Sequence, residues 1–308
     1  MTVEIGLHFP HFGPLATAST QADVLTVAER VGVHTIWVGD HIVVPADVAS
    51  RYPYHESGSA SFEAEAAYYE PFTVLAWAAG RTERVRLGFS VLVVPYRHPL
   101  LTAKIASTLD DLSGGRLTLG VGVGWMAEEF AALGADFGRR GAVTDEYLDV
   151  MTAAWAESPV AFSGTEVNFP PLGVRPLPVQ RPRPPVLVGG HSRPALRRAL
   201  RIGDGWQATA NTPDELAALV EQLTELAGGA LPEGFEISSR MHLPRFSVDG
   251  RDGISPEEIR ALVAAYRDAG AQHLVVHVWD RDPARYLARL EALAAWLGLD
   301  AQGHATAV

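Results

Sequence analysis

Residues 84–94 read RVRLGFSVLVV and form the most strand-like stretch of the chain. From residue 87 onward this stretch is apolar on both faces, as expected of a parallel strand that helices cover on both sides. A helical pattern follows over residues 99–112 and ends at Ser113 and two glycines, before a second apolar strand at 116–123. This order of elements is typical of a parallel βα arrangement.

The same alternation of strand and helix runs along almost the whole chain. The expected strands lie at residues 3–9, 34–39, 84–94, 116–123, 185–189, 205–210, within 235–248, and at 272–278. Eight βα units predict an α/β protein with one closed (β/α)₈ TIM barrel over residues 1–299 and a flexible tail over 300–308. The alternative is an open doubly wound sheet, but HFPHFGP at residues 8–14 lacks the glycine-rich turn that usually follows its first strand.

Composition narrows the class of protein. The chain has 308 residues, 47% of them hydrophobic, and a formal net charge of −11, which argues against nucleic acid as a partner. The absence of cysteine excludes disulfides, thiolate catalysis and cysteine-ligated zinc. No stretch is long and apolar enough to span a membrane, and the first residues lack a signal-peptide pattern. We therefore expect a cytoplasmic enzyme that does not associate with membranes.

Function in such a barrel is expected at the C-terminal ends of the strands. Histidines recur there, namely His8, His11, His41, His191 and His277. Each one alone is equally well explained as a structural, hydrogen-bonded histidine, whereas the clustering favours a site. Because no short HxH or HExxH spacing occurs, no metal site is predicted.

Two glycine-rich strand ends indicate room for a ligand. Gly189 and Gly190, with His191 and Ser192, end a strand and open a helix, where backbone N–H groups and the helix dipole favour a phosphate. The alternative is a tight turn with Ser192 as the helix N-cap. The glycines at 120, 122 and 124 leave space either for a flat ligand or for close packing of the barrel.

The loop after the second strand, residues 40–70, is far longer than usual for a βα connection. It carries Tyr52, Tyr54, His55, Phe62, Tyr68 and Tyr69. At the mouth of a barrel such a loop would serve as a lid or substrate wall. The alternative is an insertion that only packs or mediates dimer contacts.

Four stretches resemble a known family. They are TIWVGDH at 35–41, the segment 84–125 that includes SGGRLTLGVGVGW, RGAVTDEYLDVM at 140–151, and PPVLVGGHSRPALRRALRIGDGW at 184–206. Together they resemble the luciferase-like monooxygenase superfamily, and more narrowly its oxidoreductases that use the 8-hydroxy-5-deazaflavin coenzyme F420. The resemblance spans residues 3–297 and implies a barrel that is usually dimeric, so we expect a homodimer.

The resemblance also implies where the coenzyme binds. Its phosphate would lie near Val188, Gly189, Gly190, His191 and Ser192. A non-proline cis peptide, here Ser90–Val91, would press on the central ring. Further ring or side-chain contacts would come from His8, Val123, Gly124 and Trp125.

Asp40 and His41 match a pair near the reactive edge of the coenzyme ring, and both are predicted to be catalytic. Some F420-dependent dehydrogenases of this family carry an acidic proton donor where this chain has Trp125, which argues against a sugar-phosphate substrate. His41 is our candidate acid/base, because imidazole exchanges protons near neutral pH. The alternative role of His41 is a structural hydrogen bond.

Three functions follow from the resemblance. The first is hydride transfer between F420 and a small organic substrate, whose identity the sequence does not reveal. The second is an FMN-dependent monooxygenase that uses reduced flavin and dioxygen. The third is a non-catalytic flavin-binding partner protein, which would be expected to lose the polar residues that this chain retains at the strand ends.

Overall fold

The computed structural model describes residues 2–54, 58, 63–250 and 252–308. Eight parallel strands form a closed barrel, because the last of them in sequence pairs with the first. They are β1 (Val3–His8), β2 (Thr35–Val38), β3 (Arg86–Val93), β4 (Leu117–Gly122), β7 (Val186–Gly189), β8 (Gly205–Ala210), β9 (Glu236–Met241) and β10 (His273–Val276). The predicted (β/α)₈ barrel is confirmed.

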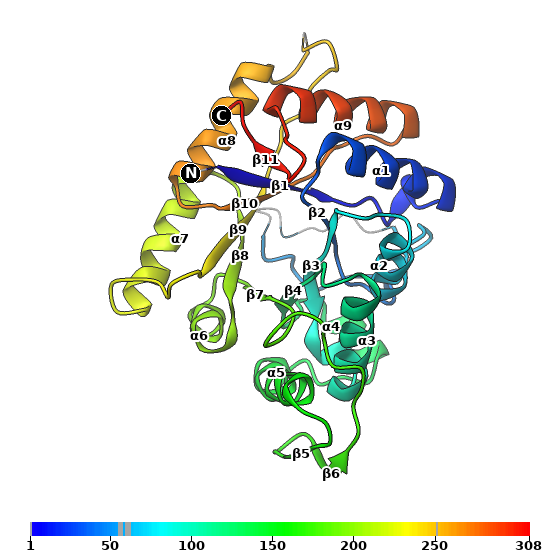
Figure 1. Ribbon diagram of the computed structural model, residues 1–308, viewed down its shortest axis with the longest axis vertical. Coiled ribbons are helices and arrows are strands. Elements are labelled where there is room, and N and C mark those ends of the chain that lie inside the picture. The colour runs from blue at the N-terminus through cyan, green and yellow to red at the C-terminus, as the bar shows by residue number, and fades with distance from the viewer. Residues whose placement is uncertain (1, 55–57, 59–62, 251) are drawn as a thin grey trace.

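Helices alternate with these strands and cover the outside of the barrel (Figure 1). They are α1 (Ala18–Val31), α2 (Pro71–Ala79), α3 (Pro99–Leu112), α4 (Ala127–Ala132), α5 (Arg140–Ala156), α6 (Arg193–Ile202), α7 (Pro213–Leu226), α8 (Pro256–Asp268) and α9 (Pro283–Leu297), with short 3₁₀ turns η1 (Gly13–Leu15) and η2 (Val94–Tyr96). Thr17, Ser192, Thr212, Ser255 and Asp282 each cap a helix by accepting a hydrogen bond from a first-turn backbone N–H. These caps fix where the helices begin.

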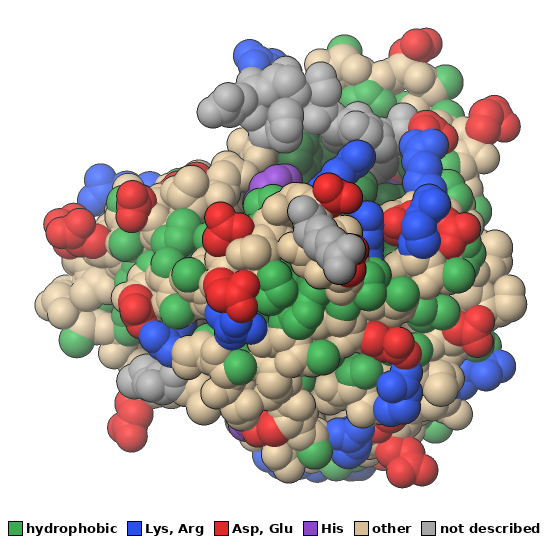
Figure 2. Space-filling model, turned by 90° about the horizontal axis from the view of Figure 1, so that it is seen from above, with side chains coloured by type: hydrophobic (Ala, Val, Ile, Leu, Met, Phe, Trp, Pro, Cys, Tyr) green, Lys and Arg blue, Asp and Glu red, His purple; other side chains and the backbone are tan. Residues whose placement is uncertain are grey.

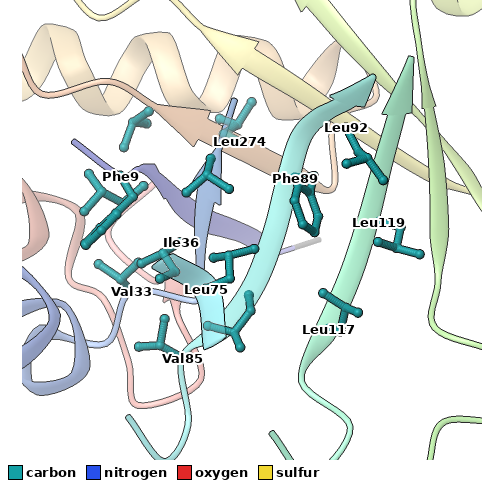
Figure 3. Packing of buried hydrophobic residues seen from close by; sticks show 14 of the residues in the cluster. Phe9, Val33, Ile36, Leu75, Val85, Phe89, Leu92, Leu117, Leu119 and Leu274 are labelled. Carbon is teal, nitrogen blue, oxygen red and sulfur yellow. The ribbon is translucent and has the colours of Figure 1, made fainter. Parts of the chain in front are cut away.

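The main hydrophobic core lies between the barrel and its helices. The rings of Phe72 in α2 and Phe89 in β3 have centroids 4.6 Å apart. Figure 3 shows Leu75 of α2 beside Ile36 of β2, and both side chains belong to the same buried cluster. Burial of such apolar area is the dominant favourable contribution to folding.

The inside of the barrel is packed around the indole of Trp37. Trp37 contacts Leu187 and Val275 in a separate buried cluster. A Cβ atom at Gly6 would lie 2.4 Å from Nε1 of Trp37, and one at Gly88 would lie 2.4 Å from its Cε3. Glycines on the neighbouring strands therefore make room for the largest side chain in the interior.

The proline-rich segment after α5, residues 158–183, has no regular sequence pattern, yet part of it forms strands. It forms an antiparallel hairpin of β5 (Val160–Ser163) and β6 (Asn168–Leu172). Figure 1 shows the hairpin at the lower end of the molecule, beyond α5 and away from the barrel strands. It does not contribute to the strand ends where function is expected.

The tail over residues 300–308 differs from the expectation of a flexible end. Within it, β11 (His304–Ala305) pairs antiparallel with β1, with Ala305 opposite Val3 and His304 opposite Glu4. Asp300 fixes the turn before this strand by accepting hydrogen bonds from the backbone N–H groups of Gln302 and His304. A local turn and strand pairing, which hydrophobic periodicity does not report, thus anchor the tail.

No helix in the described part of the chain is long and apolar enough to cross a membrane. On the face shown in Figure 2, acidic and basic side chains lie interspersed among apolar ones. The described side chains on this face do not form the continuous basic surface that binding to a phosphate backbone requires.

Gly120 in β4 provides a test of the packing inside the barrel. A Cβ atom there would lie 2.0 Å from the carbonyl oxygen of Phe89, so Gly120→Ala forces two neighbouring strands apart. We expect the free energy of unfolding to fall by about 2 kcal/mol or more, measured by urea denaturation. The matched control is Gly80→Ala, because Gly80 has φ −78° and the nearest atom to its Cβ position is 3.8 Å away. Equal stability of the two variants would contradict this packing.

Candidate active site

The C-terminal ends of the strands meet at one end of the barrel, which we call the mouth. The imidazole centroids of His8, at the end of β1, and His277, just after β10, are 4.9 Å apart. Val91 of β3 reaches the ends of β4 and β7, since a Cβ atom at Gly122 would lie 2.6 Å from its Cγ2 and one at Gly189 would lie 2.9 Å from its Cγ1. The structure therefore brings together strand ends that the sequence predicted to share one site.

Asp40, directly after β2, forms a buried ion pair. Its two oxygens accept hydrogen bonds from Arg97 Nη1 and Nη2 at 2.7 and 2.9 Å, and the backbone N–H of Val93 donates to it at 2.9 Å. Arg97 also donates to Glu70, the N-cap of α2, at 3.0 Å. Through these contacts Asp40 positions the loops that follow β2 and β3. The sequence predicted a catalytic role for Asp40 instead.

His41, the next residue, forms a pair with a carboxylate that the sequence analysis did not assign. His41 Nδ1 lies 2.6 Å from Glu129 Oε2, and the Glu129 side chain is fully buried. Tyr96 Oη donates to the same oxygen at 3.0 Å, while the backbone N–H groups of Ile42 and Val43 donate to Oε1 at 2.7 and 3.2 Å. Burial alone would raise the pKa of Glu129, but the hydrogen bond from His41 and the other donors lower it.

Glu129 had a weak sequence signal, because it lies four residues beyond Trp125 in the short helix α4. Its neighbour Glu128 faces a different part of the same loop and accepts hydrogen bonds from the backbone N–H groups of Ala49 and Ser50 at 2.8 and 3.0 Å. Consecutive carboxylates of α4 therefore hold two portions of the segment that follows β2. The contact between α4 and this loop is long-range, so spacing along the chain could not predict it.

The long loop lies across the mouth. Tyr52 contacts Trp125 with ring centroids 5.2 Å apart, and Tyr54 contacts His191 at 5.3 Å. Tyr52 and Tyr54 also pack against each other at 5.6 Å, which completes a row of rings from the end of β4 to the end of β7. This is the position expected of a lid or substrate wall. His55 and Phe62, predicted for the same wall, lie outside the described residues.

At the end of β7 the structure shows the tight turn with Ser192 as the N-cap of α6, while phosphate binding there stays a prediction. Gly190, with φ +110°, accepts a hydrogen bond at its carbonyl from Trp206 Nε1 at 2.8 Å. The backbone N–H of Thr209 donates to His191 Nε2 at 3.0 Å, and burial lowers the pKa of His191. The hydroxyl of Ser192 caps α6, as in the structural alternative. The glycine backbone remains the part of this turn that can approach a phosphate closely.

The ends of β3 and β4 carry the remaining predicted coenzyme contacts. The Ser90–Val91 peptide is cis, as the resemblance implied. Ser90 is buried and its Oγ has no hydrogen-bond partner. Gly124 has φ +80°, and a Cβ atom there would lie 2.6 Å from the ring of Phe130. Val123, Gly124 and Trp125 are all partly exposed at the mouth.

The other imidazoles of the mouth are held in the neutral form. Burial lowers the pKa of His8 well below its usual value, and Nδ1 of His8 has no hydrogen-bond partner. Burial likewise lowers the pKa of His11 to about 4, and that of His277 to about 3 with help from Arg240. These side chains offer neutral polar contacts at neutral pH and are poorly suited to accept a proton there.

One group of three possible metal ligands occurs among the described residues, at the opposite end of the barrel. It consists of Glu4, His34 and His273. Trp37 Nε1 donates a hydrogen bond to His273 Nε2 at 2.9 Å, and Glu4 Oε2 lies 3.3 Å from His273 Nδ1. Nδ1 must then carry the proton that Glu4 accepts, so this nitrogen has no lone pair for an ion. We interpret the group as a hydrogen-bonded cluster.

Comparison with known proteins places the chain in a family. The model of the luciferase-like monooxygenase family matches residues 7–243. This chain belongs to that family. Family members are flavin- or F420-dependent oxidoreductases and monooxygenases, so the chain is an enzyme of this luciferase-like class.

Three relatives of this luciferase-like chain carry names that differ in the coenzyme stated: one states none, one states F420 and one states FMNH(2). An "Uncharacterized protein" of Mycobacterium tuberculosis is 34% identical over 262 residues, which cover 84% of this chain and 86% of the relative. A "Putative coenzyme F420-dependent oxidoreductase" of the same species is 36% identical over 193 residues, 57% of this chain and 55% of that protein. An "FMNH(2)-dependent dimethylsulfone monooxygenase" of Pseudomonas putida is 27% identical over 205 residues, 64% and 56% of the two chains.

Solved structures with the same luciferase-like fold include a monooxygenase and an F420-dependent reductase. The monooxygenase RslO1 from Streptomyces bottropensis aligns with a TM-score of 0.77 and 24% identity, over 96% of this chain and 98% of its own. The F420-dependent tetrahydromethanopterin reductase from Methanopyrus kandleri aligns with a TM-score of 0.71 and 19% identity, over the same shares. At these identities the likeness establishes the fold alone.

The buried pair of His41 and Glu129 predicts a pH-dependent loss of stability in Glu129→Gln. Because the folded protein lowers the pKa of Glu129, its ionised carboxylate stabilises the fold above the unfolded-state pKa, and this contribution is lost as pH falls. We expect Glu129→Gln to unfold about 2 kcal/mol more easily at pH 7, with a smaller difference at pH 4.

Urea denaturation at both pH values measures this difference. Glu233→Gln is the control, because Glu233 is an exposed glutamate outside the mouth. A deficit of Glu129→Gln that is the same at pH 7 and pH 4 would show that its ionised carboxylate does not stabilise this site.

Proposed function

We propose that this enzyme transfers a hydride between coenzyme F420 and a small organic substrate, with His41 as the acid/base. The observation that carries the proposal is the pairing of His41 with the buried carboxylate of Glu129 at the mouth, 2.6 Å apart. The same imidazole lies beside Trp125, with ring centroids 6.3 Å apart. A titratable group is thus oriented where the resemblance expects the reactive edge of the coenzyme.

The residues at the mouth fit a flat, polar-edged ring with a phosphate-bearing tail. Ser90 Oγ and His8 Nδ1 are buried polar atoms without partners, and a bound ring could satisfy both. Gly190 has φ +110° and a Cβ atom there would lie 3.1 Å from that of Ala195, so the turn requires a glycine, whose bare backbone could approach a phosphate. A bound deazaflavin would supply the hydride chemistry, and the chain would hold it with these groups.

Glu129 orients His41 for proton exchange with the substrate. Its carboxylate accepts the proton on Nδ1, which fixes the tautomer and directs the Nε2 edge of the ring away from Glu129. In the proposed reaction Nε2 of His41 gives a proton to a carbonyl oxygen during reduction, or removes one from an alcohol during oxidation. Tyr52, Tyr54 and Trp125 would exclude water from this step.

The coenzyme choice is supported by the relatives. The relative named as F420-dependent is 36% identical over the aligned residues, against 27% for the FMNH(2)-dependent monooxygenase. The second relative favours the alternative candidate function, an FMN-dependent monooxygenase. Its substrate would occupy the same mouth, and reduced flavin and dioxygen would replace F420.

Titration of the purified protein with each coenzyme tests the proposal. We expect F420 to bind at least ten times more tightly than FMN, by fluorescence quenching or calorimetry, because a long anionic tail adds contacts beyond a single phosphate. Tighter binding of FMN, together with substrate-dependent dioxygen uptake, would establish the alternative instead. Binding of neither coenzyme would refute both candidates.

His41→Ala tests the proposed acid/base. We expect kcat to fall by about 10²- to 10⁴-fold while the affinity for coenzyme is retained. Turnover is followed at the coenzyme absorbance band with the first carbonyl or alcohol substrate found by screening. His304→Ala is the control, because His304 lies in β11 at the opposite end of the barrel. Unchanged turnover of His41→Ala would remove His41 from the mechanism.

A further inference from the structure

Arg240 is a cation inside the mouth that the proposed coenzyme site does not use. It lies near the end of β9, opposite Val275 of β10 and Thr209 of β8. Val275 faces the barrel interior, where it packs with Trp37 and Leu187. Since residues at the same level of neighbouring strands share a face, the side chain of Arg240 also points inward.

Arg240 has no counter-ion within residues 2–54, 58, 63–250 and 252–308. Its guanidinium makes no ion pair or hydrogen bond there, unlike Arg97, which binds Asp40 and Glu70, or Arg198, which binds Asp145. Arg240 is nevertheless only partly exposed. A partly buried cation without a partner is costly for a folded protein, so a site for an external anion is the simplest physical reason to retain it.

The groups around Arg240 are uncharged at neutral pH. They are the imidazoles of His8 and His277 and the phenols of Tyr54 and Tyr68, all close enough for the positive charge to influence their pKa values. Burial lowers the pKa of both histidines and raises that of both tyrosines. A single positive charge thus stands in a neutral, polar surrounding, where its interaction with an anion is strong.

Arg240 is on β9, which lies opposite β3 in the strand order of the barrel and carries no proposed coenzyme contact, although His8 of β1 is close to it. Those contacts come from the ends of β1, β2, β3, β4 and β7, which leaves the ends of β8, β9 and β10 to face the substrate. Beside Arg240, the ring of His277 stacks on Trp279 at 3.9 Å, and Trp279 is 51% exposed. This side therefore combines a cation with an accessible aromatic surface.

We infer that Arg240 binds the oxyanion of an organic acid, so that the substrate of this enzyme carries a carboxylate or sulfonate group. The planar guanidinium can donate two parallel hydrogen bonds to such a group. Trp279 and His277 provide a flat surface for the organic part of the molecule. This inference rests on the proposed function, because the proposed coenzyme site defines which side of the mouth is left for the substrate.

Calorimetric titration of the full chain, with and without coenzyme, tests this assignment with three matched probes. Benzoate and benzenesulfonate carry the oxyanion, and benzamide is the neutral analogue of benzoate. We expect one or both anions to bind at least ten times more tightly than benzamide. Arg240→Gln should weaken anion binding at least tenfold and leave benzamide unchanged, while Arg240→Lys should retain part of the preference.

Arg245→Gln is the matched control, because Arg245 is an exposed arginine just after β9. It should bind all three probes as the wild type does. The inference is overturned if the wild type does not prefer the anions, or if Arg240→Gln keeps that preference. It is also overturned if Arg240→Gln weakens coenzyme binding and leaves the anions unaffected. Because the probes are read without turnover, a failure of the F420 assignment does not alter this result.

Discussion

The carboxylate of Glu129 organises the mouth of this barrel. It is carried by helix α4 and accepts hydrogen bonds from two segments that are distant from α4 in sequence, namely residues 41–43 after β2 and Tyr96 after β3. A fully buried carboxylate is tolerable only when donors surround it, so these segments must come together for the fold to form. The orientation of His41 and the start of the long loop both follow from that requirement.

The two sides of the mouth differ in which side chains they carry. Toward β4 and β7, glycines such as Gly122 and Gly189 remove side chains, and Val91 fills the space that they leave. The side chain of Val91 therefore forms part of the surface on which a flat ring would lie. Toward β9 and β10, Arg240 and His277 project side chains into the same space, which suits recognition of a smaller and variable molecule.

The barrel could be predicted from sequence because its strands are buried on both faces, which leaves a strong local pattern such as that of residues 84–94. The placement of His41 at a strand end followed from the same pattern. The sequence did not predict the roles of Glu129, Arg97 and Arg240. Those roles depend on which charged or hydrogen-bonding groups lie beside each side chain in the folded barrel. The β5–β6 hairpin was hidden by its prolines, and the pairing of β11 with β1 is a tertiary contact of a two-residue strand.

The net charge of −11 does not preclude an anion site at the mouth, because charge matters where it is not already compensated. The carboxylates nearest the mouth, Asp40 and Glu129, are buried and saturated by Arg97, His41 and backbone donors. The buried imidazoles contribute no charge at neutral pH. Arg240 is then the uncompensated charge in the described part of the mouth, and a local field of this kind outweighs distant surface charges that salt screens.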